Sequence, residues 1–361
     1  MHISKAMTEG TQTSVAFGDA SAQYAAVRET GAGLIDLSSR GRITVGGLEA
    51  VQFLNGLITN DMKTLLEDTW MPAVFPNVQG RLVASVRIMR LKDIDTDKVT
   101  CPSYLIDTEA ASHENVLKIL QRFTLAGDFR VNDITAETAE FTVQGLKADK
   151  VVRSILGDAV TNLAAHGAIK TSWGAMEVTA LHAPQISAKG FDLIISTGQA
   201  SRLWEALVAA GATPVDESAY EVLRIEAAVP RYGVDMDETN VVTETNLDDA
   251  VSYTKGCYIG QEIIARIKYR GHVAKKLVGL SFADKADVAP ADTIKSSDGK
   301  DIGRITSTTY SPQLRRTIAL GYVKYDYLAA GTPVKVIHEG SEVPAHMTEL
   351  PFIRDEQSDA G

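Results

Sequence analysis

The sequence is poor in cysteine and contains no long apolar run. Cys101 and Cys257 are the only two cysteines in 361 residues, and they lie far apart in the chain. Such a pair does not make a disulfide framework, so a reducing compartment is expected. No segment approaches the roughly 20 uninterrupted apolar residues that a membrane helix needs, and residues 1–14 lack the apolar core of a signal peptide. We therefore expect a soluble cytoplasmic protein with no membrane partner.

The sequence also lacks the spacings that mark common metal and nucleotide sites. None of its seven histidines forms a zinc-type pair, and the two cysteines are too distant to complete a local site. A Walker loop, a dinucleotide fingerprint and a Gly-x-Ser-x-Gly turn are all missing. We therefore predict no metal ligands, and the familiar nucleotide-binding and serine-hydrolase classes are disfavoured.

Positive charge is in deficit over the whole chain but concentrated in one place. Lys and Arg number 36 against 46 Asp and Glu, and this net charge of −10 argues against a surface built wholly for nucleic acid. A basic run contains Arg266, Lys268, Arg270, Lys275 and Lys276, with His272 among them. Such a run is compatible with a solvated surface, with a site for the anionic tail of a ligand, or with a contact to a phosphate backbone. Because the chain as a whole is acidic, tRNA is the weaker alternative as a partner.

One octapeptide carries most of the chemical information. It reads Lys255-Gly256-Cys257-Tyr258-Ile259-Gly260-Gln261-Glu262, and a helix-like run follows. The glycines let the loop turn tightly and let another molecule approach its amides. A helix start and a nearby cation both favour the thiolate form of a cysteine. From these residues alone, a working thiol tuned by Lys255 and a small buried cysteine in an ordinary turn are both open.

Apolar spacing and capping residues predict a mixed α+β fold for the first part of the chain. Helices are expected around residues 48–58, 116–123 and 203–208, and Asp216 is expected to cap a helix through Ile225. Short strands are expected at 35–37, 43–45, 82–88 and 141–143. From about Lys275 the pattern changes to short strands at 277–282, 301–308, 317–324 and 334–338. Turn signals separate them, which predicts a small all-β module.

The octapeptide resembles the Lys-Gly-Cys-Tyr-x-Gly-Gln-Glu signature of YgfZ-type proteins, the folate-binding relatives of the glycine-cleavage T protein. Further segments resemble that superfamily, namely residues 33–38 with 41–45, residues 54–61 and residues 224–233. The likeness spans roughly residues 31 to 280. It implies an α+β fold, with a T-protein-like folate-binding body of two interleaved α+β subdomains over residues 15–270. A C-terminal small β-barrel is implied over residues 271–353.

The resemblance implies a site for tetrahydrofolate. The candidate cofactor-binding residues are Asn60, Asp61, Arg224, Glu226, Arg231, Tyr232, Gly256 and Gln261. It also places Ala84 and Ser85 where the T protein has a carboxylate pair, and Ala188 where that protein has a pterin-binding glutamate. General acid–base chemistry needs a titratable group within hydrogen-bond reach. Aminomethyl transfer is therefore predicted to be lost.

The resemblance to YgfZ-type proteins also implies a role in the assembly or maintenance of iron–sulfur proteins, including those that modify tRNA, so the hypothesis is a folate-binding accessory factor of that kind. Cys257 and Lys255 are its predicted working groups. A thiolate is a soft ligand for iron–sulfur species, but a cluster is usually held by several cysteines. A transient cluster would therefore be shared with a partner, and we expect reduced folate and iron–sulfur assembly or client proteins as partners. The alternative is a tetrahydrofolate-dependent aminomethyltransferase or demethylase.

Overall fold

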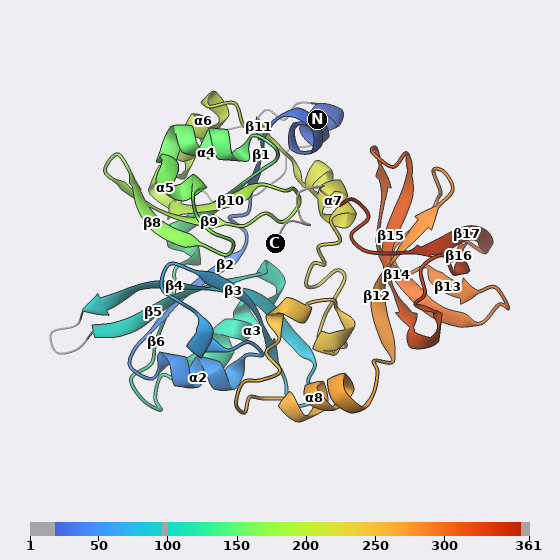
Figure 1. Ribbon diagram of the computed structural model, residues 1–361, viewed down its shortest axis with the longest axis horizontal. Helices are drawn as coiled ribbons and strands as arrows, with labels where there is room; N and C mark the ends of the chain where they lie inside the picture. Colours follow the sequence, from blue (N-terminus) through green and yellow to red (C-terminus); the bar gives the residue numbers. More distant parts are fainter. Residues whose placement is uncertain (1–18, 96–99, 355–361) are drawn as a thin grey trace. The chain divides into compact units, whose positions relative to one another are not determined.

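The computed structural model describes residues 19–95 and 100–354, so the expected terminal tails lie outside the described residues. The chain forms two compact units, and each unit is built from two separate stretches of sequence. The first combines Met1–Ile43 with Asp133–Tyr220, and the second combines Thr44–Asn132 with Glu221–Gly361. This alternation confirms the predicted interleaving of two subdomains. The elements of each unit can be followed in Figure 1.

The first unit is built on a six-stranded sheet with the order β11-β1-β7-β10-β9-β8. Its strands are β1 (Gly33–Asp36), β7 (Thr138–Gln144), β8 (Ala168–Trp173), β9 (Met176–His182), β10 (Gly190–Ser196) and β11 (Thr213–Pro214). Its helices are α1 (Ala20–Ala25), continued by the π-helix η1 (Ala26–Thr30), then α4 (Ala148–Leu156), α5 (Asp158–Thr161) and α6 (Ala200–Ala209). Phe141, Leu193 and Leu203 are fully buried where the sheet meets these helices. The unit therefore has a core of its own.

Helix α7 (Glu217–Glu226) begins at the end of the first unit and continues into the second. The Asp216 carboxylate accepts a hydrogen bond from the Ala219 backbone amide at 3.0 Å. This bond satisfies one of the amide groups that a helix start leaves without an intrahelical partner. The predicted capping role of Asp216 is confirmed.

The second unit contains a five-stranded sheet with the order β3-β4-β5-β2-β6. The strands are β2 (Gly41–Gly46), β3 (Trp70–Pro76), β4 (Leu82–Asp95), β5 (Thr100–Thr108) and β6 (Arg130–Asp133), and the helices α2 (Ala50–Leu57) and α3 (Ala110–Gln121) accompany them. Helix α3 packs on β4 and β5. It buries Val116 and Leu120 completely, as an amphipathic helix does with its apolar stripe.

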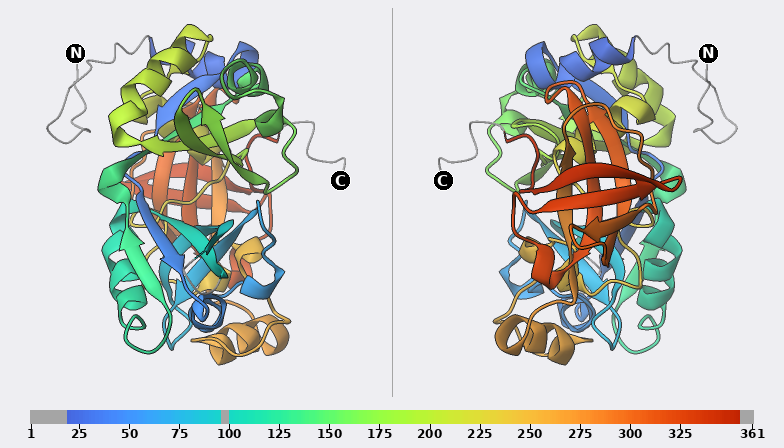
Figure 2. Two further views of the ribbon diagram at one scale, coloured as in Figure 1. Left: turned by 90° about the vertical axis from the view of Figure 1, so that its left-hand side faces the viewer. Right: turned by 90° about the vertical axis from the view of Figure 1, so that its right-hand side faces the viewer.

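A closed six-stranded barrel completes the second unit, in the order β12-β15-β14-β13-β16-β17. Its strands are β12 (Lys275–Phe282), β13 (Thr293–Ser296), β14 (Asp301–Ser311), β15 (Arg316–Lys324), β16 (Pro333–His338) and β17 (Ser341–Thr348), and they are seen from two sides in Figure 2. Leu280, Ile294 and Val336 fill the barrel and are fully buried. The predicted small C-terminal β-barrel is confirmed. In the part of the chain that the structure describes, no helix is long and apolar enough to cross a membrane.

Candidate functional site

The loop that carries the octapeptide is fastened to the end of helix α2 by the side chain of Lys255. Its ammonium group donates hydrogen bonds to the backbone carbonyls of Asn55, Ile58 and Asn60, at 2.7, 3.0 and 2.6 Å. A helix end leaves carbonyl groups without intrahelical partners and carries partial negative charge, so a buried cation is well placed there. Lys255 is only 7% exposed. The lysine therefore acts as a clamp that joins two segments about 200 positions apart.

Backbone bonds extend this clamp on both sides of Lys255. The Ser252 amide donates to the Thr59 carbonyl at 3.0 Å, and the Ile259 amide donates to the Gly56 carbonyl at 3.1 Å. The Thr59 hydroxyl, fully buried, donates to the Ala250 carbonyl at 2.6 Å. The loop from Ala250 to Ile259 is thus held along its length against the end of α2.

The predicted site residues Asn60 and Asp61 lie in this framework. The Asn60 amide group donates to the carbonyls of Pro72 and Asp249 at 2.8 and 3.1 Å, and its side-chain oxygen accepts from the Asp61 amide. Asp61 accepts from the Lys63 amide at 3.0 Å and so caps a short 3-10 turn. Their side chains shape the turn that receives Lys255, and a folate-binding role for them stays a prediction.

Burial lowers the pKa of Lys255 from its ordinary 10.5 to about 8, although the nearby Asp61 carboxylate acts in the opposite direction. The ammonium nitrogen also lies 5.0 Å from the centre of the Tyr258 ring. Among the described residues, no hydrogen bond joins it to the Cys257 sulfur. The predicted tuning of Cys257 by Lys255 stays a prediction, and the observed contacts of Lys255 are those of a structural clamp.

Cys257 is the part of the octapeptide that reaches solvent. Its thiol is exposed, in contrast to the buried thiol of Cys101. The two flanking glycines differ in kind. Gly260 has φ +78°, and a Cβ atom there would lie 2.4 Å from the Asn77 carbonyl oxygen, whereas a Cβ on Gly256 would meet nothing within 4 Å. Gly260 is therefore required by the fold, and Gly256 simply leaves the backbone next to Cys257 uncovered.

Helix α8 (Gln261–Arg270) begins directly after Gly260. The side-chain amide of Gln261 turns back and donates to the Lys255 carbonyl at 3.4 Å, so this predicted cofactor residue also supports the loop. Ile264 is fully buried and joins an apolar cluster with Tyr258 and the predicted site residue Tyr232. Burial raises the pKa of Tyr232 to about 12, and that of Tyr258 likewise to about 12. The cluster brings the octapeptide and the Arg224–Tyr232 segment together in one unit.

A second clamp surrounds Arg224, which is fully buried. Its guanidinium forms ion pairs with Asp235 and Glu221 and donates to the Ser307 hydroxyl of the barrel at 2.7 Å. Asp235 in turn accepts from the hydroxyls of Thr306 and Ser307 at 2.6 and 2.7 Å. Bidentate, charge-assisted bonds of this type fix geometry strongly. Arg224 thus ties α7 and the following loop to strand β14.

Glu226 and Arg231 continue the same network. Glu226 is fully buried, and it accepts a hydrogen bond from the Ser311 hydroxyl at 2.6 Å. Arg231 pairs with Glu221 at 3.1 Å, and its side chain is one-third exposed. Of the two predicted site arginines, Arg231 is therefore the one whose side chain is partly open to solvent.

Sequence reasoning missed the residues that complete both clamps. Asp235 and Ser307 carry no motif signal by themselves, and Thr59 lies in the segment 54–61, but its bond to Ala250 cannot be read from that segment because the partner is distant in sequence. It also missed a buried ion pair between Arg87 and Asp107, 2.6 Å apart on the adjacent strands β4 and β5. Arg87 is two positions after Ser85 on β4, so both side chains lie on the same face of the sheet, and Asp107 lies directly across from Arg87 on β5. A carboxylate is therefore present on the sheet face where Ser85 lies, but it is already paired.

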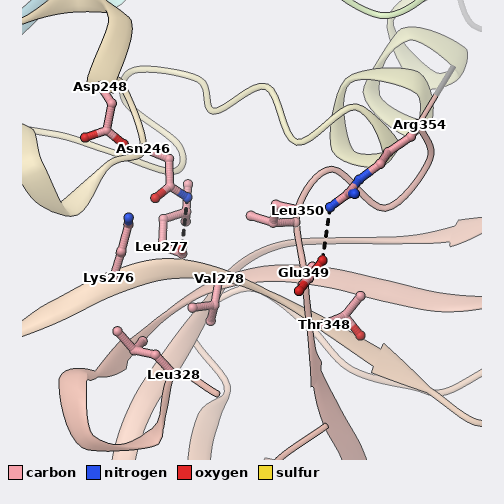
Figure 3. A pocket seen from close by; sticks show the side chains of 10 residues that line it. All are labelled: Asn246, Asp248, Lys276, Leu277, Val278, Leu328, Thr348, Glu349, Leu350 and Arg354. Atoms are coloured by element: carbon pink, nitrogen blue, oxygen red, sulfur yellow. Dashed lines mark hydrogen bonds and ion pairs between the residues drawn. The ribbon is translucent and has the colours of Figure 1, made fainter. Parts of the chain in front are cut away.

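The second unit also has a surface pocket of about 390 Å³ beside the barrel (Figure 3). Leu277, Val278, Leu328 and Leu350 provide apolar surface, and Lys276 and Arg354 lie on opposite sides. Asn246 is fixed there by a 2.9 Å hydrogen bond to the Leu277 carbonyl, and Arg354 pairs with Glu349 at 3.0 Å. Asp248 and Thr348 complete the lining. None of the predicted site residues lines this pocket.

An interleaved α+β body followed by a closed six-stranded barrel defines a specific class of two-part protein. Residues 7–255 match the GCVT N-terminal domain, and residues 275–353 match the glycine cleavage T-protein C-terminal barrel domain. The chain belongs to the glycine cleavage T-protein family. The T-protein-like fold predicted from the sequence is confirmed.

Individual relatives agree with this assignment. The chain is 30% identical to an aminomethyltransferase of Geobacillus kaustophilus, over 96% of this chain and 93% of that protein. It is 29% identical to an aminomethyltransferase of Thermotoga neapolitana, over 91% of this chain and 88% of that protein. Its fold is similar to the crystal structure of the glycine cleavage system aminomethyltransferase T from Bartonella henselae. The TM-score is 0.82 at 20% identity, over 92% of this chain and 89% of that one.

The contrast between the two glycines gives a first prediction. Gly260→Ala is expected to lower the free energy of unfolding by about 2–3 kcal/mol, because it adds both a left-handed residue and a backbone clash. Gly256→Ala is expected to change it by less than about 0.5 kcal/mol. Urea denaturation of the two variants beside the wild type measures this difference. Equal stability of the two variants would contradict the assignment of Gly260 to the fold.

Lys255→Met tests the first clamp and its pH dependence. The pKa of Lys255 is about 8 in the folded protein against an ordinary 10.5. At a pH between these two pKa values, Lys255 is protonated in the unfolded chain and deprotonated in the folded chain. The free energy of unfolding of the wild type therefore rises with pH in this range. Below pH 8 both states are protonated and the gain is absent. We expect the stability difference between wild type and variant to grow by about 1–2 kcal/mol from about pH 8 to pH 10.

The quantity to measure is the difference in free energy of unfolding between the wild type and Lys255→Met at each pH. Other groups that titrate in the same range contribute to both proteins and cancel in this difference. Near pH 7 the variant should already be less stable by about 2 kcal/mol, because three carbonyls lose their donor. A difference that stays constant between pH 8 and pH 10 would show that the carbonyls hold the pKa of Lys255 at its ordinary value.

Proposed function

We propose that this chain is a YgfZ-type member of its family, a folate-binding accessory factor for the assembly or maintenance of iron–sulfur proteins, including those that modify tRNA. The observation that carries the proposal is the geometry of the octapeptide loop. Lys255 anchors the loop from within through three carbonyl bonds, while Cys257 stands exposed at its surface. A thiol held in this way is placed to meet another molecule.

Cys257 suits a transient role toward iron–sulfur species. Thiolate sulfur is a soft ligand for such species. Among the described residues, no group of three or more His, Cys, Asp or Glu side chains is arranged to hold a metal ion. A cluster that contacts Cys257 therefore takes its other ligands from a partner protein. Thiol exchange with a partner is the second route open to the same group.

Folate binding is supported by membership of the family and by the names of its relatives, which are aminomethyltransferases. A reduced folate carries an anionic glutamate tail. Arg231, whose side chain is one-third exposed beside Glu221, is the best placed of the predicted residues to bind that tail through charge-assisted hydrogen bonds. The buried Arg224 contributes by holding the segment that presents Arg231.

Aminomethyl transfer to tetrahydrofolate, or a related demethylation, is the second candidate. The named relatives favour it, and Asp107 supplies a carboxylate on the relevant sheet. Ala84, Ser85 and Ala188 count against it, because the resemblance places them at the positions of the T protein's carboxylates and none of them titrates. Asp107 is bound to Arg87 at 2.6 Å, and an ion-paired carboxylate is a weak proton acceptor. The accessory role is therefore preferred.

The ligand gives the next prediction. Tetrahydrofolate or its polyglutamate is expected to bind with a Kd of about 1–10 μM, near −8 to −7 kcal/mol, as measured by calorimetry under anaerobic conditions. Arg231→Met is expected to weaken binding of the polyglutamate by about tenfold, because it removes a charge-assisted contact. Arg316→Met, at an exposed barrel position, is the matched control. An absence of heat and of thermal stabilisation at millimolar folate would refute the folate proposal.

The same purified protein separates the two candidate functions. When tetrahydrofolate and an aminomethyl donor are supplied together, the accessory factor should release no ammonia above the rate without protein. Turnover that persists in Cys257→Ala and disappears in Asp107→Asn would establish the second candidate instead.

Cys257→Ala tests the proposed working group. Removal of an exposed sulfur should change stability by less than about 0.5 kcal/mol, yet the variant should fail to restore iron–sulfur enzyme activity in cells that lack the wild-type protein. Iodoacetamide should label Cys257 faster than Cys101, because Cys101 is only 3% exposed.

Cys101→Ala is the matched control for this experiment. It removes the other thiol from a buried position, so it should lower stability measurably while activity in cells is restored. Full restoration by Cys257→Ala at normal expression would show that Cys257 has no chemical role.

A further inference from the structure

Helix α8 presents an exposed surface next to Cys257. Only Ile264 of the helix is fully buried, in the cluster with Tyr258, and the other side of the helix is open. Tyr269 is 66% exposed and Ile259, just before the helix, is 37% exposed. Both side chains add apolar surface on the solvent side of the segment that carries Cys257. The helix lies at the edge of its unit in Figures 1 and 2.

Helix α8 and the start of β12 carry a group of cations. Arg266, Lys268 and Arg270 are exposed on α8, and Lys275 and Lys276 follow at the start of β12. Within residues 19–95 and 100–354, none of the three cations on α8 forms an ion pair, although many other lysines and arginines of this unit do. Lys275 instead interacts with the nearby carboxylates of Asp237 and Glu244, and Lys276 lines the pocket beside the barrel. Lys268 lies over the Tyr253 ring at 4.9 Å, and Lys275 lies over the Tyr322 ring at 4.9 Å. A positive patch thus stands out on a chain with net charge −10.

The dimensions of this surface suit one protein–protein contact. Helix α8 has ten residues and is therefore about 15 Å long. A typical stable interface covers about 800 Å² on each partner, a patch about 30 Å across. Cys257, three residues before Gly260 at the start of the helix, therefore falls inside the area that a partner seated on α8 would cover.

We propose that Gly256–Gly260 and the exposed face of α8, named here the α8 surface, form a docking surface for the acidic face of a partner protein. This inference rests on the proposed accessory function and states the chemistry of the partner. Tyr269 and Ile259 offer apolar contacts near the two ends of α8, and tyrosine and arginine are residue types in which protein interfaces are enriched. Cations at its rim attract an acidic partner and orient it during the encounter.

A protein fits this surface better than a nucleic acid does. Glu262 is exposed on the same helix, one turn before Arg266, so the positive charge of this face is interrupted. A mixed charge pattern suits the local charges of a protein surface better than the uniform charge of a phosphate backbone. The aliphatic side chain of Ile259 offers an apolar contact, and the uncovered backbone at Gly256 allows close approach of another chain. The docking surface would then hold the partner's thiols or cluster beside Cys257.

The test uses the full chain and an acidic [4Fe–4S] ferredoxin as the defined probe, with binding measured by calorimetry at moderate salt. Arg266→Glu with Arg270→Glu should weaken binding at least tenfold. The matched control, Arg122→Glu with Lys285→Glu, makes the same change in net charge at exposed positions elsewhere in the unit and should change binding less than twofold. Tyr269→Ala should weaken binding in a way that added salt does not reproduce, because it removes an apolar contact.

The proposal would be overturned if the wild type did not bind ferredoxin, or if both double variants weakened binding equally. It would also be overturned if Arg266→Glu with Arg270→Glu abolished binding of poly(U) but retained binding of ferredoxin. The last result would assign the surface to nucleic acid. Loss of activity in cells by this double variant, with full activity of Cys257→Ala, would keep the docking surface and refute the role of the thiol. Cys257→Ala is expected to bind ferredoxin with a Kd within twofold of the wild-type value. This result would show that docking does not depend on the thiol.

Discussion

The buried ammonium of Lys255 is the interaction on which the candidate site depends. An isolated charge inside a protein is very costly, and only hydrogen bonds to the charged group make it tolerable. Three carbonyls at the end of α2 supply those bonds, and they can do so only when the helix end and the loop hold one fixed geometry. The cost of a misplaced ammonium therefore enforces the position of the loop, and with it the position of Cys257.

Arg224, like Lys255, is a buried cation that holds two segments of the chain together. Its contacts with Glu221, Asp235 and Ser307 join α7 and the following segment to β14. Both cations are fully satisfied by protein groups. Many polar residues that the motifs single out therefore build the frame. The groups left for ligands and partners are fewer: the Cys257 thiol, the partly exposed Arg231 side chain and the α8 surface.

The sequence allowed much of the fold to be predicted and less of the site. Helices with a clear apolar stripe, such as α2 and α3, and the capping role of Asp216 follow from local patterns. Strand β10 has no such pattern, because six of its seven residues are buried and both faces are covered, so apolar and polar residues do not alternate. Strands β3 and β5 also carry too little alternation to be recognised.

The site residues show a different limit of sequence reasoning. The motif identified Lys255 and Gly260 as special, but their partners lie about 200 and 180 positions away, at Asn55 and Asn77. The two glycines look alike in the sequence and differ only in their backbone angles and surroundings. Spacing along the chain reports which residue types gather, whereas the function of each depends on contacts that form only after folding.

The division of the octapeptide into an inner and an outer part explains why its chemistry must involve a second molecule. Lys255, Tyr258 and Gly260 face inward and are occupied by the fold, so the exposed thiol receives no second ligand from its own loop. A single rigid thiol gains specificity only when a partner is oriented against it. The unpaired cations of the α8 surface provide that orientation at long range, and Tyr269 and Ile259 provide contact at short range. The Lys255 clamp thus fixes the position of the Cys257 sulfur, and the docking surface selects the partner protein that reaches it.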